Sequence, residues 1–532
     1  MTALLLPLLA AIPVMAAAVT AILPSRQAGR LVALAVPAAT AVAGLVLLVL
    51  HRSEPVIAAS VGGFVPGVAI PFVSDSFAAL MLVTTGVVAL MSLVFCDQTG
   101  EFGRSRYFAP LALLLLAGAN GALLTGDLFN LFVFVEVMLL PSYALIAMTG
   151  TWRRLGVGRL FVVINLLTST LLLAGVGFVY GTAGSVNLAV LAGAAQEDGR
   201  VAAALGVVLM ALCIKAGAVP VHGWLPRAYP GTSAGVMALF SALHTKVALY
   251  AVIRIWATAF DLDPAWGRVL LVVALVTALW GAVASASPVG AREILAWQMV
   301  SGVGVILAAL AVAQAPGGAI VYMIHHMVTI GALVMLIGAA EHVYRSGQLA
   351  GLSGLWYRER PLGVLLVLAI AALVGLPPTS GLTGKLEVVT AALGTGGAWG
   401  VATVVVVLVS SLIGLVAMLR LWRGIMWGGP APRPGDDDGD SDERQQGVDE
   451  HGGDDGDDDD DDDVRPSPRV PARLLVPGGV LAALSVAIFL GYGAIAPEVD
   501  RAVAGLVDTG AYVSAVLDGP DAMTDSTIGG RS

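Results

Sequence analysis

Long apolar segments recur along most of the chain, and each is close to the length that crosses a membrane. A transmembrane helix needs about 20 predominantly apolar residues to span a hydrocarbon core of about 30 Å. The pattern predicts an all-α integral membrane protein with fourteen spans, at residues 3–23, 31–50, 76–95, 108–124, 128–148, 158–180, 200–220, 234–256, 267–287, 294–313, 318–340, 361–393, 398–422 and 474–496.

Two of these segments contain glycines and prolines that interrupt a helix. Segment 361–393 is too long for one straight helix and carries the break Gly375-Leu-Pro-Pro-Thr-Ser-Gly381, and segment 200–220 ends in a similar break from Gly217 to Pro220. Broken segments at corresponding places in two halves of a membrane chain indicate an inverted repeat. Broken helices are tolerated at membrane depth only where they line a cavity or pack in protein. We therefore predict two half-channels that meet near the midplane.

The arginines indicate the orientation, because short cytoplasmic loops collect Lys and Arg. Residues 1–23 have no basic region before the apolar run, so they do not read as a cleaved signal, and we expect the N-terminus outside. Loops on the predicted cytoplasmic side up to the eleventh then hold twelve arginines: Arg26, Arg30, Arg104, Arg106, Arg153, Arg154, Arg159, Arg227, Arg292, Arg345, Arg358 and Arg360. The other loops hold four: Arg52, Arg200, Arg254 and Arg268. This alternation favours fourteen spans, with both termini outside.

Composition agrees with a membrane protein: 58% of residues are hydrophobic, 12% are charged and the mean hydropathy is +0.88, against roughly 25% charged residues in soluble domains. The net charge of −9 is misleading, because residues 436–463 hold 17 acidic residues and one arginine. We predict that 423–473 is a disordered cytoplasmic loop. Its acidic run is read first as a solvated linker and, as the alternative, as a site that attracts cations or docks a partner.

Only three lysines occur, and each falls inside an apolar segment or at its break: Lys215, Lys246 and Lys385. Arginine stays charged under nearly all conditions, whereas a buried lysine can lose its proton readily. The lysines therefore indicate a need for buried cations that can become neutral. Lys215 precedes the first break and Lys385 follows the second, a mirrored order that fits two halves of opposite topology.

Acidic residues inside the apolar segments are equally few. Glu136 lies in mid-span, Asp127 lies at the start of the same span, and Glu387 follows Lys385. An ionisable group at the bilayer centre costs about 2.5–3.5 kcal/mol on insertion scales and faces protein or water. We expect Lys215 to be the partner of Glu136, either as a structural ion pair or as part of a proton relay.

Four histidines, His222, His244, His325 and His326, favour the relay, because imidazole titrates near neutral pH. Each of them alone is also consistent with a satisfied hydrogen bond in the core. No metalloprotease, paired CxxC, dinucleotide or Walker motif occurs, and the two cysteines suggest neither a disulfide framework nor a metal site. We therefore expect no catalytic, cofactor-binding or metal-binding residues and no nucleic-acid partner.

The stretch Lys215-Ala-Gly-Ala-Val-Pro-Val-His222-Gly-Trp-Leu-Pro-Arg-Ala-Tyr-Pro230, followed by Ser241-Ala-Leu-His-Thr-Lys246, resembles the antiporter-like membrane subunits of complex I, membrane-bound hydrogenases and Mrp-type antiporters. The stretch from Gly126 to Glu136 and the ending from Val507 to Leu517 are similar to the D subunit of Mrp-type cation/proton antiporters.

This resemblance implies a fold with two inverted five-helix repeats, at 108–256 and 267–422, after an N-terminal segment 1–107 and before a last helix 474–496 and a tail 497–532. It implies that Glu136 and Lys215 form the essential pair, that Lys246 is the central relay lysine, and that Lys385 serves the second half. The tail is expected to begin as an amphipathic surface helix. The implied partners are the other Mrp antiporter subunits, the lipid bilayer, and the exchanged Na⁺ or K⁺ and H⁺, in the plasma membrane of a prokaryote.

Two positions depart from the family pattern. Ile330 stands where the family often has a lysine, and the segment from Trp297 to Ser301 lacks a histidine that is common there. Two other functions stay open: a proton-pumping subunit of a redox complex of the complex I or hydrogenase type, and a structural scaffold without its own ion path.

Overall fold

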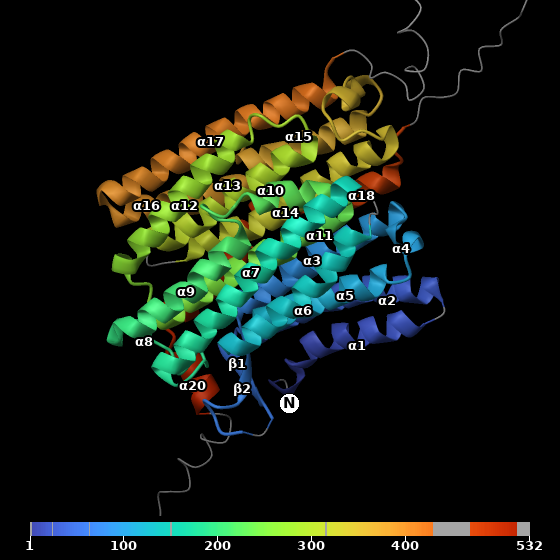
Figure 1. Ribbon diagram of the computed structural model, residues 1–532. Coiled ribbons are helices and arrows are strands. Elements are labelled where there is room, and N and C mark those ends of the chain that lie inside the picture. Colours follow the sequence, from blue (N-terminus) through green and yellow to red (C-terminus); the bar gives the residue numbers. More distant parts are fainter. Residues whose placement is uncertain are drawn as a thin grey trace, which may run out of the picture.

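The computed structural model describes residues 3–23, 25–62, 64–148, 152–428 and 469–518. In this part of the chain the structure is a bundle of long helices with one small hairpin (Figure 1). The helices are α1 (Leu8–Ile22), α2 (Arg26–Leu50), α3 (Ser76–Gln98), α4 (Glu101–Arg104), α5 (Phe108–Leu124), α6 (Leu128–Ala147), α7 (Trp152–Ala183), α8 (Ala194–Glu197), α9 (Gly199–Ala216), α10 (Trp224–Ala228), α11 (Ala234–Phe260), α12 (Pro264–Ala284), α13 (Ala291–Val312), α14 (Gly317–Tyr344), α15 (Arg360–Val374), α16 (Ser380–Thr395), α17 (Gly397–Met426), α18 (Ala472–Leu490), α19 (Tyr492–Val507) and α20 (Gly510–Leu517).

The predicted membrane class and fold class are confirmed. Eleven described helices are long and apolar enough to cross a membrane, and three shorter apolar helices, α1, α5 and α15, complete the set of fourteen. Segment 361–393 divides as predicted into α15 and α16. Helix α11 lies at the centre of the bundle, because the residues of its most apolar stretch are all buried. Helices α7 and α12 lie at the perimeter, where they expose apolar side chains.

The two ends of the bundle carry different structures. At one end, the hairpin end, β1 (Val56–Val61) pairs antiparallel with β2 (Ile70–Asp75), and β1 also contacts α20 and the first turn of the chain. At the other, the α4 end, lie α4 and the end of α17, next to the gap at 429–468 (Figure 1). The hairpin was not predicted. The acidic run at 436–463 lies outside the described residues.

Two sequence expectations differ from the structure. Arg254, expected in a loop, is buried within α11, where its guanidinium pairs with Asp75 at 2.6 and 2.8 Å. Segment 474–496 does not form one helix, because α18 ends at Leu490 and α19 begins at Tyr492. The expected surface helix of the tail therefore begins earlier. An ion pair from Glu498 to Arg52 ties it to the turn that follows α2, and Glu498 also pairs with Arg501 one turn along α19.

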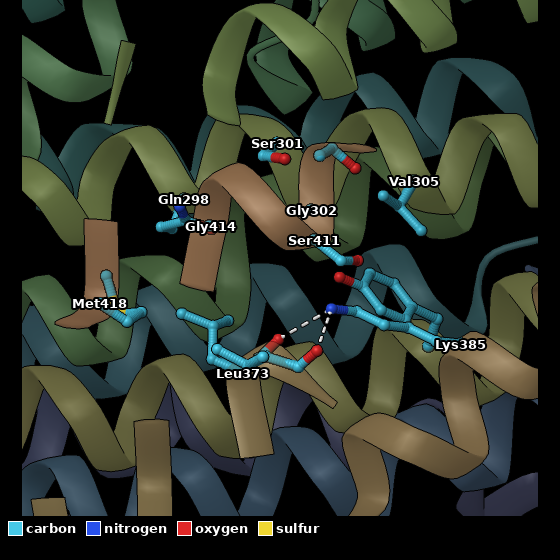
Figure 2. Close-up of a pocket in the computed structure, with 12 residues that line it drawn as sticks. Gln298, Ser301, Gly302, Val305, Leu373, Lys385, Ser411, Gly414 and Met418 are labelled. Carbon is cyan, nitrogen blue, oxygen red and sulfur yellow. Dashed lines mark hydrogen bonds between the residues drawn. The ribbon is translucent and has the colours of Figure 1, made fainter. Parts of the chain in front are cut away.

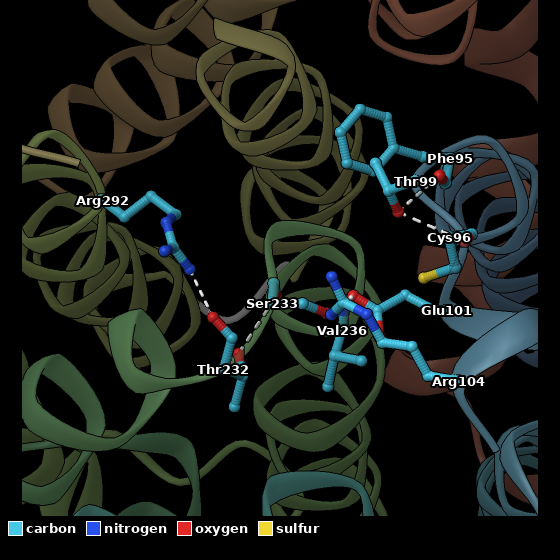
Figure 3. A network of polar contacts seen from close by, with 9 residues as sticks. All are labelled: Phe95, Cys96, Thr99, Glu101, Arg104, Thr232, Ser233, Val236 and Arg292. Carbon is cyan, nitrogen blue, oxygen red and sulfur yellow. Dashed lines mark hydrogen bonds and ion pairs between the residues drawn. The ribbon is translucent and has the colours of Figure 1, made fainter. Parts of the chain in front are cut away.

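Polar contacts also fix the α4 end of α11. Ser233 accepts a hydrogen bond from the Val236 amide and so caps the helix, and Arg292 of α13 donates to the Thr232 carbonyl (Figure 3). Arg292 is also paired with Glu341 of α14 at 2.7 Å. A buried ion pair thus holds one end of the central helix, and a partly buried ion pair between α13 and α14 lies beside its other end.

Candidate functional site

Both predicted breaks fall at the C-terminal ends of half-helices. Helix α9 ends at Gly217 (φ +89°) and α15 ends at Gly375 (φ +92°), left-handed conformations that glycine adopts without strain. The last carbonyls of a helix have no partner within the helix and carry the negative end of its dipole, so they favour a nearby cation. Lys215 lies in the last turn of α9. Lys385, on α16, donates to the Leu373 and Val374 carbonyls at the end of α15.

Glu136 and Lys215 are brought together through a serine that the sequence analysis did not identify. Ser169 of α7 donates its hydroxyl proton to the Glu136 carboxylate and accepts a hydrogen bond from the Lys215 ammonium at 3.0 Å. No direct ion pair within 4.0 Å joins the glutamate to the lysine in the described part of the chain. One hydroxyl therefore connects α6, α7 and α9 around two opposite charges.

Glu136 and Lys215 begin a row of ionisable side chains across the bundle, and His244 of α11 is the next member of this row. Its Nε2 is 2.8 Å from the Ser142 hydroxyl of α6, and that hydroxyl also bonds the Met138 carbonyl at 2.7 Å. Because a hydroxyl has one proton, donation to the carbonyl leaves it to accept from His244 Nε2–H. The ring is enclosed by Phe240 and Phe161, with centroid distances of 4.6 and 6.0 Å.

Lys246 is fully buried in the middle of α11, with 1% of its surface exposed. Its ammonium donates to the neighbouring Thr245 hydroxyl at 3.1 Å. A fully buried lysine with a single neutral hydroxyl partner is costly to keep charged. His326 of α14 is close enough to interact electrostatically with Lys246, so the row continues across the α11–α14 contact.

The two histidines of α14 differ in their surroundings. His325 Nδ1 is 2.8 Å from the Ser380 hydroxyl at the start of α16 and 3.1 Å from Thr329. Ser380 in turn lies 2.8 Å from Ser485 of α18. Neither ring nitrogen of His326 has a hydrogen-bond partner among the described residues, and a methyl group on Gly302 of α13 would overlap this ring.

Lys385 borders a small polar cavity of about 10 Å³, at the threshold of what one water molecule needs (Figure 2). Polar side chains from three other helices reach the same space: Gln298 and Ser301 of α13, Tyr322 of α14, and Ser410 and Ser411 of α17. The Lys385 ammonium lies 2.6 Å from the Val374 carbonyl and 3.2 Å from that of Leu373. The second half therefore places its lysine against a helix end and a site for water.

The remaining predicted residues lie outside this row. Asp127 caps α6 by accepting a hydrogen bond from the Asn130 amide at 2.8 Å. Glu387 accepts a hydrogen bond from the Tyr492 hydroxyl of α19 at 2.8 Å, so it is directed toward the C-terminal segment. His222 is half-buried in the break after α9, with Trp297 of α13 5.6 Å from its ring.

The structure thus brings Glu136, Lys215 and His244 together in one group, and His325, His326 and Lys385 in a second, with Lys246 between them. Sequence reasoning missed the serines that connect these groups: Ser169, Ser142, Ser380 and Ser485. The described residues contain no group of three or more His, Cys, Asp or Glu side chains that could hold a metal ion.

Residues 125–414 match the family model described as NADH:quinone oxidoreductase/Mrp antiporter, TM. This match covers both breaks, all three lysines and more than half of the chain. The chain belongs to this family. Among curated relatives, the D subunit of a Na⁺/H⁺ antiporter from Bacillus subtilis (strain 168) is 32% identical over 466 residues, 86% of this chain and 88% of the relative. A protein of the same name from Alkalihalophilus pseudofirmus is 35% identical over 366 residues, 68% of this chain and 74% of the relative.

Solved structures agree with this family membership. A chain in the structure of the Mrp complex from Dietzia sp. DQ12-45-1b is 38% identical, with a TM-score of 0.87 over 96% of this chain and 99% of that chain. A chain of an archaeal membrane-bound sulfane sulfur reductase is 24% identical, with a TM-score of 0.81 over 97% of this chain and 100% of that chain. The second likeness concerns the fold.

Proposed function

We propose that this chain is a subunit of a multi-subunit cation/proton antiporter of the Mrp type, in the plasma membrane of a prokaryote, where it works with the other Mrp antiporter subunits. Its relatives of 32 and 35% identity are named as D subunits of Na⁺/H⁺ antiporters, and its neighbour of 38% identity comes from an Mrp complex. Its role is transport of Na⁺ or K⁺ against H⁺, without a catalytic residue or a cofactor.

The observation that carries the mechanism is the row of buried and half-buried ionisable side chains across the bundle. Protons move along Glu136, Lys215, Lys246 and Lys385, assisted by His222, His244, His325 and His326, with Asp127 and Glu387 as accessory groups. A proton that arrives at one group displaces the charge on the next, because neighbouring like charges in a low-dielectric interior repel strongly. This sideways displacement drives cation efflux through the complex.

In this proposal the two repeats, 108–256 and 267–422, supply one half-channel each, and both termini face the outside. The hairpin end is then the outer surface and the α4 end is the cytoplasmic surface. The C-terminal ends of α9 and α15 would stabilise the lysine of each half while it is charged. When the lysine loses its proton its side chain becomes a neutral amine, a form that a buried lysine adopts readily.

A second candidate is a proton-pumping subunit of a complex I-like or hydrogenase-type redox complex. The specific observation in its favour is the fold shared with respiratory complex I from Thermus thermophilus, at a TM-score of 0.74 and 20% identity. A third reading, a scaffold without its own path, requires the three lysines to be dispensable. Neighbouring genes distinguish the first two readings: small hydrophobic antiporter subunits against electron-transfer subunits.

The test is Na⁺- or K⁺-dependent proton exchange, reported by a pH-sensitive dye, in everted vesicles that contain the full complex. We expect Lys215→Ala and Glu136→Ala to abolish exchange while the complex still assembles, because each removes a titrating member of the row. Lys215→Arg keeps a positive charge that does not titrate near neutral pH, and we expect it to be inactive as well.

Assembly is checked on a native gel, and Arg358→Ala serves as the control because Arg358 is exposed and outside the row. Normal exchange in Lys215→Ala and Glu136→Ala would refute the relay. A wild-type complex that moves protons only when an electron donor is oxidised would favour the redox pump.

A further inference from the structure

A cavity of about 360 Å³ lies at the α4 end of the bundle, away from the row of lysines. It opens between the turn that joins α1 to α2 and the turn that precedes α5. Its polar wall consists of Ser25, Arg26, Ser105 and Arg106, and its apolar wall includes Ile22 and Phe102. The volume lies within the range of small-molecule sites, about 300–1,000 Å³.

The two arginines are positioned by contacts that cross between these turns. Arg26, the first residue of α2, donates to the Gly103 carbonyl of α4 at 3.1 Å. Arg106 donates to the Ala21 carbonyl near the end of α1 at 2.9 Å. Each guanidinium has five N–H donors, so one such bond leaves most of its capacity unused.

Neither of these arginines has an acidic partner among the described residues, in contrast to their neighbours. Arg30 pairs with Asp97 at 2.6 Å, and Arg104 pairs with Glu101 at 3.0 Å (Figure 3). The local positive charge is therefore concentrated on the two arginines that line the cavity. Helices α2 and α5 also begin here, and the positive ends of their dipoles add to this charge.

The surface beside the cavity is apolar. Ile22 is 80% exposed and Leu31 is 62% exposed, on the two helices that meet at the turn. Tyr107 is 55% exposed, and its ring lies 5.1 Å from the Arg106 guanidinium. Exposed aliphatic residues below a rim of arginine and tyrosine are typical of the level where lipid tails meet headgroups.

We propose that this cavity binds the phosphate of an anionic phospholipid, with Arg26 and Arg106 as its ligands and the acyl chains along the exposed faces of α1 and α2. Arginine matches phosphate through paired, charge-assisted hydrogen bonds. Basic pockets between transmembrane helices on the cytoplasmic side favour such headgroups. The proposal stands independently of the transport function.

The test uses the purified, complete complex and counts the phospholipids that remain bound by native mass spectrometry, after exchange into phosphatidylcholine nanodiscs that contain a small fraction of phosphatidylglycerol. We expect the wild type to retain phosphatidylglycerol above its share of the bilayer. The double variant Arg26→Gln/Arg106→Gln should bind it roughly 30-fold more weakly, from about 1 kcal/mol per basic residue at a membrane surface.

Arg358→Gln is the matched control, because it removes an exposed arginine elsewhere and should leave phosphatidylglycerol retention unchanged. Arg26→Lys/Arg106→Lys keeps both charges and should retain part of the binding. Equal retention by the wild type and the glutamine variant would overturn the proposal. Binding of millimolar inorganic phosphate that depends on Arg26 and Arg106, with no retention of phosphatidylglycerol above its share of the bilayer, would also overturn it, by assigning the cavity to a soluble anion.

Discussion

Ser169 offers the sharpest test of the proposed proton path, because its hydroxyl is the link between Glu136 and Lys215. In Ser169→Ala the carboxylate loses a donor and the ammonium loses an acceptor at 3.0 Å. The substitution removes one oxygen from a buried position and changes neither charge. Its effect therefore reports the link itself, separately from the titrating groups.

The magnitude follows from the bonds that are lost. A hydrogen bond to a charged group contributes about 1.5–3 kcal/mol. If the loss of one such bond is borne by the proton-transfer step, the rate falls by roughly 10- to 150-fold. We expect this decrease in the initial rate of cation-dependent proton exchange in everted vesicles, at an unchanged amount of assembled complex.

Thr170→Ala is the matched control. Thr170 is the next residue of α7, is exposed, and bonds only the Leu166 carbonyl of its own helix at 3.0 Å. We expect this variant to exchange at the wild-type rate. A Ser169→Ala complex that works within twofold of the wild type would refute the assignment of the hydroxyl to the path.

Two further predictions concern stability. Asp75→Asn leaves the buried Arg254 charge without its partner, so we expect the free energy of unfolding to fall by about 3–5 kcal/mol, seen as a lower melting temperature of the complex. The double variant Asp75→Leu/Arg254→Met should recover most of this loss. An unchanged melting temperature in Asp75→Asn would contradict the assignment. Burial alone would raise the pKa of Glu498, but hydrogen bonds from Arg501 and Arg52 outweigh it and hold this pKa below its usual range. The stabilisation of α19 is therefore present at neutral pH and is lost as the pH falls through the lowered pKa. Hydrogen exchange of the backbone amides of residues 492–507 should accelerate at acid pH in the wild type. After correction for intrinsic rates, exchange in Glu498→Gln should not depend on pH.

Hydropathy and charge were sufficient to predict the membrane fold and the burial of Lys215 and Lys246. A lysine in an apolar segment is a rare signal, and Lys215 and Lys246 stand out from the sequence for this reason. Serines give no such signal, because they are common in transmembrane helices, where they bond carbonyls of their own helix. Ser169 is distinguished from the exposed Thr170 beside it only by the helix that it faces, which is a property of tertiary packing.

The misplaced elements have a related cause. Arg254 resembles a residue at the end of a span, and its partner Asp75 is 179 positions away, so no local pattern reveals that the pair is buried. The hairpin was missed because its strands flank a short segment rich in glycine and proline, which reads as a loop. The end of α18 was placed too late because apolar residues continue past Gly491 into α19.

The part of the proposed path between Lys246 and Lys385 determines whether protons can leak across the membrane when no cation is exchanged. In the described part of the chain no hydrogen bond joins Lys246 to His326, and the space beside Lys385 admits about one water molecule. A continuous chain of water molecules would conduct protons at all times and would dissipate the proton gradient across the membrane. On the proposed path, the missing hydrogen bond between Lys246 and His326 makes proton transfer conditional on a rearrangement of these side chains, so the path is closed until their charges change.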